Sequence, residues 1–366
     1  MHDRYAEYKD SGLEWTGEIP THWKTIRFKL ITQLVNDKSV CDGKKYIGME
    51  NIESWTGKYL DMGEIVPESL CNNFCKGDIL FGKLRPYLAK TYIAEEDGIC
   101  SSEFLVFRTS SSLRKYLFYL LLSFEFIEYI NSSTYGAKMP RANWDFVGKC
   151  YIPIPLQNER KLIVEFLDNE LHKIDHLITE STAQLTMLTR YKRDLIAECV
   201  TKGLNKAAPM RPSGEDWIGD VPEHWEIVPL RAFLKSNNKK NPGGLPLLSV
   251  ERERGVINRE TDGSPDNYNR IPDDLSNYKM VNEGQFVMNK MKAWQGSYGV
   301  APCDGIVSPA YHVYDLIFEN KAFFNYAIRS KCYVGFFGRD SYGIRTDQWD
   351  FKAECIKHIP FVVPSL

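Results

Sequence analysis

The chain has 366 residues, a formal net charge of −2, and a composition that is 43% hydrophobic and 13% aromatic. Such a composition is globular and excludes fibrous and intrinsically disordered classes, while the length allows two domains with a core each. Because 46 basic residues face 48 acidic ones, indiscriminate coating of polyanions is excluded, and any nucleic-acid contact requires local basic patches.

Much of the chain is repeated. The segment SGLEWTGEIPTHW begins at Ser11, and SGEDWIGDVPEHW begins at Ser213. We call this repeated segment the leader of each copy. Further landmarks recur in the same order: GDILFGKLR at Gly77 against GQFVMNKMK at Gly284, and WDF at Trp144 against WDF at Trp349. Landmarks repeated in register over this length predict two copies of one domain.

Each copy is predicted to be a mixed α and β domain. In the first copy, the runs from Gly77 to Phe81 and from Glu103 to Phe107 have the composition of short strands bounded by turn residues. One helix is predicted in each copy. Apolar residues recur at helical spacing from Leu113 to Ile127, and the stretch from Asn320 to about Tyr333 holds the same place in the second copy.

The longest periodic segment runs from about Asn158 to Lys202, followed by Gly203, a usual helix terminator. At 1.5 Å per residue, such a helix would be roughly 65 Å long. Its apolar seam requires a second helix to cover it, either as a structural spacer or as a docking surface for other subunits. The residues predicted to pack in this seam are Leu167, Leu171, Ile174, Ile178, Leu185, Leu188 and Leu195.

These elements predict an α+β protein in which two similar mixed domains are joined by a long coiled-coil-type helix. The expected boundaries are residues 1–155 for the first domain, 156–203 for the helix, 204–212 for a linker and 213–366 for the second domain. Nine irregularly spaced cysteines and no secretory leader indicate reduced thiols and a cytoplasmic protein.

Catalytic signatures are missing from the sequence. There is no glycine-rich phosphate loop, no amino-methyltransferase signature and no His-Glu-x-x-His metal helix, so we predict no catalytic residue. Cys71 and Cys75 form the only close cysteine pair and lack further ligands, so we predict no metal site.

Basic, amide and aromatic side chains instead gather beside glycines at equivalent places in both copies. Arginine and lysine pair with guanine edges or phosphates, and asparagine and glutamine pair with adenine, so these residues are candidate DNA contacts. In the first copy they are Lys83, Arg85, Tyr87, Lys90, Tyr135, Lys138, Arg141 and Asn143. In the second copy they are Asn289, Lys290, Lys292, Gln295, Arg339, Tyr342, Arg345 and Gln348.

The interiors of the two copies, residues 36–76 and 237–282, share only traces of sequence similarity. If the common frame fixes the fold and the divergent interior sets the contacts, the two copies read two different short sequences. An alternative is a non-catalytic scaffold whose duplicated heads bind proteins, which the near-neutral charge favours slightly.

The chain resembles the specificity subunit of a type I restriction-modification system. The resemblance is carried by the doubled leader, by GDILFGKLRPYLAK and DGICSSEFLVFR, and by IPIPLQNERKLIVEFLDNELHKIDHLI at the start of the long helix. It implies two target recognition domains that read the halves of an interrupted double-stranded DNA site. It also implies two methyltransferase subunits docked on the helices and recruited restriction subunits. S-adenosylmethionine, ATP and magnesium are then expected on those partners and not on this chain.

The sequence departs from the family pattern after the second domain. Family members usually continue into a second long helix that packs against the first, whereas the segment Ile359 to Pro364 leads to no such helix. We therefore expect the uncovered seam to pair with another copy of the chain or with another subunit.

Overall fold

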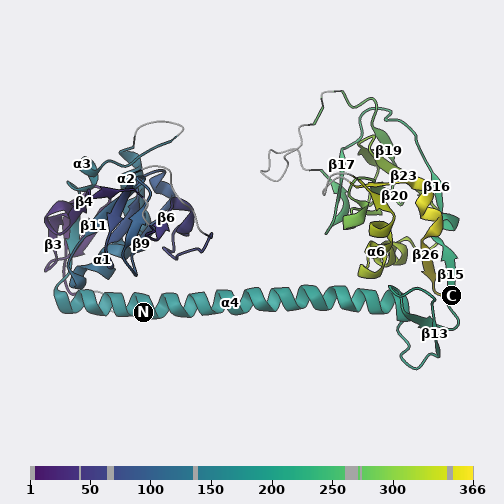
Figure 1. Ribbon diagram of the computed structural model, residues 1–366, viewed down its shortest axis with the longest axis horizontal. Helices are drawn as coiled ribbons and strands as arrows, with labels where there is room; N and C mark the ends of the chain where they lie inside the picture. Colours follow the sequence, from purple (N-terminus) through teal and green to yellow (C-terminus); the bar gives the residue numbers. More distant parts are fainter. Residues whose placement is uncertain are drawn as a thin grey trace. The chain divides into compact units, whose positions relative to one another are not determined.

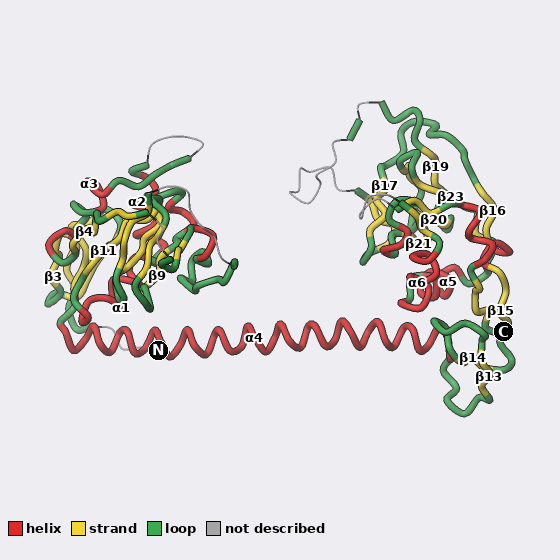
Figure 2. The backbone as a smooth tube through the Cα atoms, viewed as in Figure 1, coloured by secondary structure: helices red, strands yellow, loops and turns green. Residues whose placement is uncertain are grey.

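The computed structural model describes residues 5–40, 43–63, 70–134, 139–259, 271–272, 274–343 and 349–365. It divides into two compact units, Met1–Ile178 and Thr179–Leu366 (Figure 1). Both units contain helices and antiparallel strands (Figure 2). The division falls within α4 (Gln157–Lys202), a continuous helix of 46 residues. No helix in the described part of the chain is long and apolar enough to cross a membrane.

The first unit is built on a four-stranded antiparallel sheet of order β4-β11-β8-β9. These strands are β4 (Gln33–Val35), β8 (Ile79–Gly82), β9 (Thr91–Ile93) and β11 (Phe104–Arg108). The remaining strands are β1 (Tyr8–Leu13), β2 (Thr16–Pro20), β3 (Lys24–Arg27), β5 (Lys38–Ser39), β6 (Tyr46–Ile47), β7 (Cys71–Phe74), β10 (Gly98–Cys100) and β12 (Tyr151–Ile154). The helices are α1 (Ser111–Leu121), α2 (Phe124–Ser132) and α3 (Trp144–Val147), with short 3₁₀ turns η1 (Phe28–Leu30), η2 (Met49–Asn51) and η3 (Pro86–Leu88).

The second unit repeats this sheet as β16-β23-β20-β21. These strands are β16 (Leu234–Ser236), β20 (Phe286–Asn289), β21 (Tyr298–Val300) and β23 (Tyr311–Leu316). The others are β13 (Met210–Pro212), β14 (Asp220–Pro222), β15 (Glu226–Pro229), β17 (Leu248–Glu251), β18 (Gly255–Asn258), β19 (Lys279–Val281), β22 (Gly305–Val307), β24 (Ser341–Tyr342), β25 (Asp350–Phe351) and β26 (Pro360–Val363). The helices are α5 (Lys321–Ile328) and α6 (Lys331–Arg339), with η4 (Leu230–Phe233), η5 (Ala293–Gln295) and η6 (Ala353–His358).

The two sheets show that the sequence repeat is a structural repeat. In each unit the strand of the G-D-I-L-F or G-Q-F-V-M segment lies in the sheet interior. It pairs with the strand that follows a D-G-I segment, at residues 97–99 in the first unit and 304–306 in the second. The strand after the doubled leader also pairs with the strand just past W-D-F in both units, as β3 with β12 and β15 with β26. The interiors differ, because the hairpin of β17 and β18 stands in the second unit alone among the described residues.

The single helix predicted in each copy is wrong, since each is a pair of helices. The first breaks between α1 and α2 at Ser123, and the second breaks between α5 and α6 at Ser330. Both serines have extended backbone dihedrals, and both hydroxyls donate to a carbonyl three residues back, at 2.7 Å to Leu120 O and 2.6 Å to Ala327 O. A serine hydroxyl can compete in this way with the helical ladder, so apolar periodicity alone did not reveal the break.

Each unit has an aromatic-rich core between its main sheet and its helices. In the first unit Phe81 of the sheet is fully buried with Leu117 of α1 and Ile127 of α2. In the second unit the equivalent core includes Phe286 and Phe324. A second, smaller apolar cluster in each unit takes up other side chains of the same sheet strands. Because the sheet residues are largely buried in these clusters, the loops at the strand ends are the parts left for contacts.

The first turns of α4 belong to the first unit. Glu159 accepts hydrogen bonds from Trp23 Nε1 and His22 Nε2, both at 3.0 Å. Burial alone would raise the pKa of the Glu159 carboxyl, but hydrogen bonds from Tyr5, Trp23 and His22 lower it below its usual range. The hydrogen bond to Glu159 in turn raises the pKa of Tyr5 to about 12. The repeated His-Trp of the leader therefore fixes the start of the helix.

The last turns of α4 belong to the second unit. Val200 is buried in its core, and Ile196 packs against that core. Gly203, at φ +72°, ends the helix, and a Cβ at this position would lie 3.0 Å from the ring of Trp225, so only glycine suits both the turn and the close approach. The second leader tryptophan, Trp225, thus contacts the end of the helix, as Trp23 contacts its start.

Between these two anchors the apolar seam of α4 is open. Leu171, Ile174, Ile178, Leu185, Leu188 and Leu195 are all exposed, and Leu167 is half-buried near α1. Leucine and isoleucine at three- and four-residue steps, left exposed over this length, form the kind of face that pairs with another helix. The predicted seam is therefore present, and within the described residues most of its central side chains are exposed.

A half-buried carboxylate joins three segments of the second unit. Asp315 in β23 accepts hydrogen bonds from Asn237 Nδ2 at 2.9 Å and from Gln285 Nε2 at 2.6 Å. These two bonds lower the pKa of the Asp315 carboxyl. A carboxyl with a lowered folded pKa stabilises the protein above its unfolded pKa, about 3.9, and this stability is lost as the pH falls through the folded pKa.

We therefore predict that Asp315→Asn destabilises the second unit at pH 7, and that the difference from wild type narrows as the pH falls below about 4. Urea unfolding at several pH values, read by hydrogen exchange in the second unit, measures this difference. Glu319→Gln removes an exposed carboxylate of the same unit and is the matched control. A wild-type advantage that stays constant from about pH 7 to about pH 3 would contradict the prediction.

Candidate nucleic-acid interface

The two predicted contact segments of the first copy meet at one end of β8. Arg85 N donates to Pro140 O at 2.8 Å, and Ala142 N donates to Lys83 O at 2.8 Å. Residues 83–85 and 140–142 therefore run together as a short backbone ladder, with an isolated bridge between Leu84 and Arg141. Loops at the end of a rigid sheet position side chains well for a ligand, as the sequence predicted.

We call residues 83–85 and 140–142, with the residues next to them, the first loop pair. Its side chains differ in whether they already have partners within the protein. Arg85 and Tyr87 are exposed, and no ion pair joins Arg85 to any described residue. Arg141 makes a two-pronged contact with Glu103, at 3.0 and 3.1 Å, which raises the pKa of its guanidinium and fixes its plane. Arg85 is therefore the stronger candidate for base contact, and Arg141 would have to leave Glu103 or contact DNA with its remaining donors.

Two candidate contacts of the first copy have internal partners. Lys90 Nζ donates to Met49 O at 2.6 Å and so holds η2 against the sheet. Asn143 Oδ1 accepts from Asp145 N at 3.0 Å and caps α3. The carboxamide nitrogen of Asn143 stays available for a further contact, whereas the ammonium of Lys90 is half-buried and already engaged.

Backbone strain concentrates beside Arg85. Among the described residues three non-glycine positions have positive φ, namely Trp55 at 68°, Arg85 at 50° and Ala89 at 46°. They are neighbours, because Arg85 and Ala89 flank η3 and Trp55 N donates to Ala89 O at 3.3 Å. Strained positions of this kind cost about 1–3 kcal/mol each and gather at ligand sites. Sequence reasoning missed Trp55, and no short-range pattern marks it.

The second copy repeats the arrangement with different side chains. Phe351 N donates to Lys290 O at 2.9 Å, so the loop after β20 again runs beside the W-D-F segment. Lys290 Nζ lies 3.5 Å from Asp350 Oδ2, and Asn289 Oδ1 accepts from Met291 N at 3.1 Å. Lys292, which precedes η5, is exposed and is the positional counterpart of Arg85.

Aromatic rings stiffen this second loop pair. Trp294 and Trp349 pack with ring centroids 5.0 Å apart, which joins η5 to the segment before β25. Tyr342, on β24, is 68% exposed and pairs in register with Asp350. Arg339 forms a two-pronged contact with Asp340 at 2.9 and 3.2 Å and lies over the Trp217 ring, so it is engaged internally.

Positively charged side chains, Lys279 and Lys290, lie close together beside the second loop pair. Burial, and then the like charge of Lys290, lower the pKa of Lys279, whose ammonium donates to Tyr311 O at 2.7 Å. Burial also lowers the pKa of His312, and its Nε2 is buried without a partner among the described residues. Asp350 offsets only part of the charge of the two lysines, so an anion near Lys290 would be favoured.

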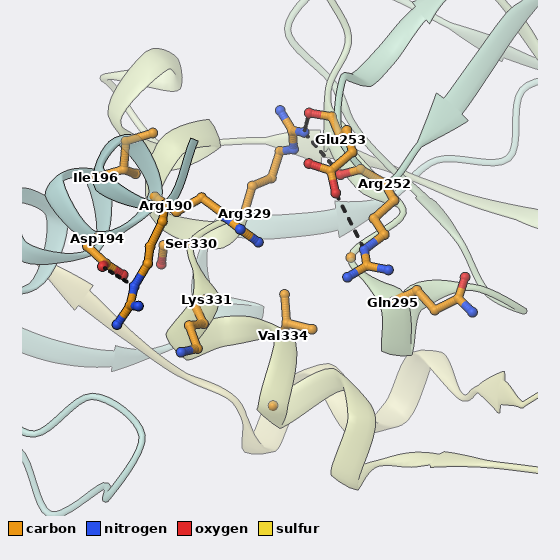
Figure 3. Close-up of a pocket in the computed structure, with 13 residues that line it drawn as sticks. Arg190, Asp194, Ile196, Arg252, Glu253, Gln295, Arg329, Ser330, Lys331 and Val334 are labelled. Carbon is orange, nitrogen blue, oxygen red and sulfur yellow. Dashed lines mark hydrogen bonds and ion pairs between the residues drawn. The ribbon is translucent and has the colours of Figure 1, made fainter. Parts of the chain in front are cut away.

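Four of the candidate contacts, Tyr135, Lys138, Arg345 and Gln348, lie outside the described residues. Gln295 lines a basic pocket beside α4 together with Arg252 and Arg329 (Figure 3). Sequence reasoning missed these arginines as a group, because they come from segments far apart in the chain.

Comparison with known proteins shows similarity to one family. A model of the type I restriction modification DNA specificity domain matches residues 23–187. The EcoDI specificity subunit of Escherichia coli, a type I restriction enzyme component, is 27% identical over 181 residues, which are 47% of this chain and 40% of that protein. The putative MjaX specificity subunit of Methanocaldococcus jannaschii is 26% identical over 283 residues, which are 68% of this chain and 64% of that protein.

A solved chain from work on complex assembly and conformational transition of the type I R-M system has the same fold. It superposes with a TM-score of 0.58 at 17% sequence identity, and the match covers 95% of this chain and 87% of that chain. The predicted fold class, two similar mixed domains joined by a long helix, is therefore confirmed.

The class defined by the fold is a protein with two similar mixed domains joined by a long helix, and residues 23–187 match the DNA specificity domain model. Over the matched segments the chain is similar to the specificity subunits of type I restriction-modification systems. It spans less than two thirds of the length of these curated relatives where they align.

Proposed function

We propose that this chain is the sequence-specific DNA-binding subunit of a type I restriction-modification complex, and that it reads an interrupted, asymmetric site. One observation carries the proposal: the two units share a sheet order, yet the loop pairs at equivalent strand ends present different side chains. Arg85 and Tyr87 occupy the first, whereas Lys292 and Tyr342 occupy the second. Two domains with the same sheet order but different side chains in their loops are suited to bind two different half-sites.

In this proposal the chemistry belongs to other subunits. Two methyltransferase subunits, which bind S-adenosylmethionine, dock on α4, and restriction subunits supply ATP- and magnesium-dependent cleavage. The exposed seam from Leu171 to Leu195 supports a docking role for α4, because apolar residues at helical spacing favour a helical partner. The residues of this chain bind and orient the DNA, and no side chain is assigned a catalytic role.

Two measurements test the proposal. Sequencing of adenine methylation in cells with and without the gene should reveal one bipartite motif that disappears with the gene. The chain together with methyltransferase subunits should then protect two short patches of that duplex, separated by an unprotected gap, with strong salt dependence. Failure to bind any duplex at any salt concentration would overturn the proposal and favour the protein-interaction scaffold.

The exposed seam also predicts the behaviour of the chain alone. Without partner subunits, we expect two copies to associate through the seam, chiefly through Ile174, Leu185 and Leu188, because pairing removes these side chains from water. Sedimentation at micromolar concentration measures the assembly state, and Leu185→Glu should shift it toward monomer. A wild-type chain that sediments as a well-behaved monomer would contradict the prediction.

A further inference from the structure

A basic pocket lies within the second unit, and Gln295 of η5 lines it beside the loop pair of β20 and β25. It has a volume of about 510 Å³ and is bounded by the last turns of α4, the turn before β18, η5 and the start of α6. Figure 3 shows Arg190 and Lys331 reaching it from one side and Arg252 and Gln295 from the other. A cavity of this size is typical of small-ligand sites.

Cations outnumber carboxylates in the lining. The cations are Arg190, Arg193, Arg252, Arg329 and Lys331, and the carboxylates are Asp194 and Glu253. Four separate chain segments converge to place these charges together. The whole chain has a net charge of −2, so this positive charge is a local excess and not a property of the chain as a whole.

The internal ion pairs do not use up these cations. Arg190 Nε lies 3.7 Å from Asp194 Oδ2, and Arg252 Nε lies 3.7 Å from Glu253 Oε1. Both distances exceed hydrogen-bonding range, and all four side chains are more than half exposed, so these pairs contribute little. The guanidinium donors remain available for an incoming anion.

Arg329 is held in place without being neutralised. Its Nη2 donates to Glu253 O at 2.6 Å and to Arg252 O at 3.3 Å. Gly255, at φ +77°, lets the guanidinium approach closely, because a Cβ there would lie 3.0 Å from Arg329 Cζ. The Nε of Arg329 is buried without a hydrogen-bond partner among the described residues, and burial lowers the pKa of this guanidinium. A nearby anion would compensate a half-buried cation of this kind.

The start of α6 adds to this field. Ser330 precedes the nine-residue helix, and Lys331 and Val334 of its first turns line the pocket. The amino end of a helix carries partial positive charge and exposes backbone N–H groups, which favours oxyanions. Planar guanidinium groups match phosphate oxygens in two-pronged contacts, so phosphate is the anion that this donor set suits best.

We propose that the pocket formed by Arg193, Arg252, Arg329 and Lys331 binds a phosphate group. Two sources share this chemistry, a phosphate of the DNA backbone and a free polyphosphate such as the tail of a nucleotide. The first source rests on the proposed DNA-binding function, and the second does not. In either case the contact is with phosphate and is independent of sequence.

The test compares wild type with Arg193→Gln/Lys331→Gln, which removes two exposed cations and leaves the half-buried Arg329 in place. Lys235→Gln/Lys357→Gln is the matched control, since it removes two exposed lysines of the same unit from outside the pocket. Thermal unfolding is followed in inorganic triphosphate, and duplex binding is followed across salt concentrations. The two single variants are measured as well, so that the result does not depend on the folding of the double variant.

If a free polyphosphate is the ligand, triphosphate raises the melting temperature of wild type and of the control, and this shift is lost in the pocket variants. If a DNA phosphate is the ligand, the pocket variants weaken binding to all duplexes alike and reduce the salt slope by about 1–2, while the control does not. The proposal is overturned if the pocket variants match the control in both assays. Absence of duplex binding by wild type would instead count against the proposed function.

Discussion

Replacing Arg85 with alanine is expected to relax recognition in one half of the DNA site and leave the other half unchanged. Arg85 is exposed at the end of the first sheet, and its backbone is fixed by the hydrogen bond from its N–H to Pro140 O. A rigidly placed guanidinium that pairs with one guanine contributes about 1–3 kcal/mol of discrimination, roughly a 5- to 150-fold preference. Competition binding with duplexes substituted at single positions of each half-site measures this preference.

Two companion variants sharpen the Arg85 experiment. Arg85→Lys keeps the charge but loses the two-pronged geometry, so it should keep overall affinity and lose most of the preference. Lys292→Ala, at the equivalent place in the second unit, should affect the other half-site; Arg345, the original candidate there, lies outside the described residues. Lys149→Ala removes an exposed cation of the first unit and is the control. Equal losses on every sequence would show that Arg85 contacts phosphate instead of a base.

Much of the frame could be predicted from the sequence because it depends on local patterns that occur twice. The strand at Gly77 to Phe81 and the strand at Glu103 to Phe107 appear as β8 and β11, and their counterparts take the same places in the second sheet. The long helix is equally visible, since its periodicity runs unbroken to Lys202. Because each pattern occurs in both copies, the second occurrence supports the prediction made from the first, and a protein with a single domain offers no such support.

The helix breaks were not predicted because they depend on a local competition that hydrophobic periodicity does not record. Ser123 and Ser330 each interrupt an apolar run that would otherwise continue, and each uses its hydroxyl to satisfy a carbonyl of the preceding turn. The clue was present in the sequence, since a serine followed by a new helical stretch can begin a helix. Aligning the two copies at these serines would have strengthened it.

The sequence selected segments that the structure brings side by side, but it did not reveal which of their side chains have internal partners. The backbone bonds of Lys83 with Ala142 and of Phe351 with Lys290 bring together the segments that sequence reasoning selected. Residue type alone does not reveal that the side chain of Lys90 is already bound, or that Asn143 caps a helix. The basic pocket was beyond prediction, because Arg252 and Arg329 meet only after the fold forms.

Replacing Trp225 with alanine is expected to destabilise the second unit by about 3–5 kcal/mol, the usual effect of deleting a large buried aromatic side chain. Trp225 is 7% exposed, belongs to the core that includes Val200, and lies against Gly203 at the end of α4. Its loss removes packing from both the core and the helix end. Hydrogen exchange should therefore show faster exchange in the core strands of the second unit and in the last turn of α4.

Trp23 gives the informative comparison, because the same leader residue is half-buried in the first unit and acts through a hydrogen bond to Glu159. Trp23→Ala should cost about 1–3 kcal/mol, the range for a hydrogen bond to a charged group, and its effect should be confined to the first unit and the first turns of α4. Trp225→Phe should recover most of the stability lost in Trp225→Ala, since an aromatic ring is kept over Gly203. If Trp225→Ala leaves exchange near Lys202 unchanged, the leader does not anchor the helix, and the doubled His-Trp serves its own domain core alone.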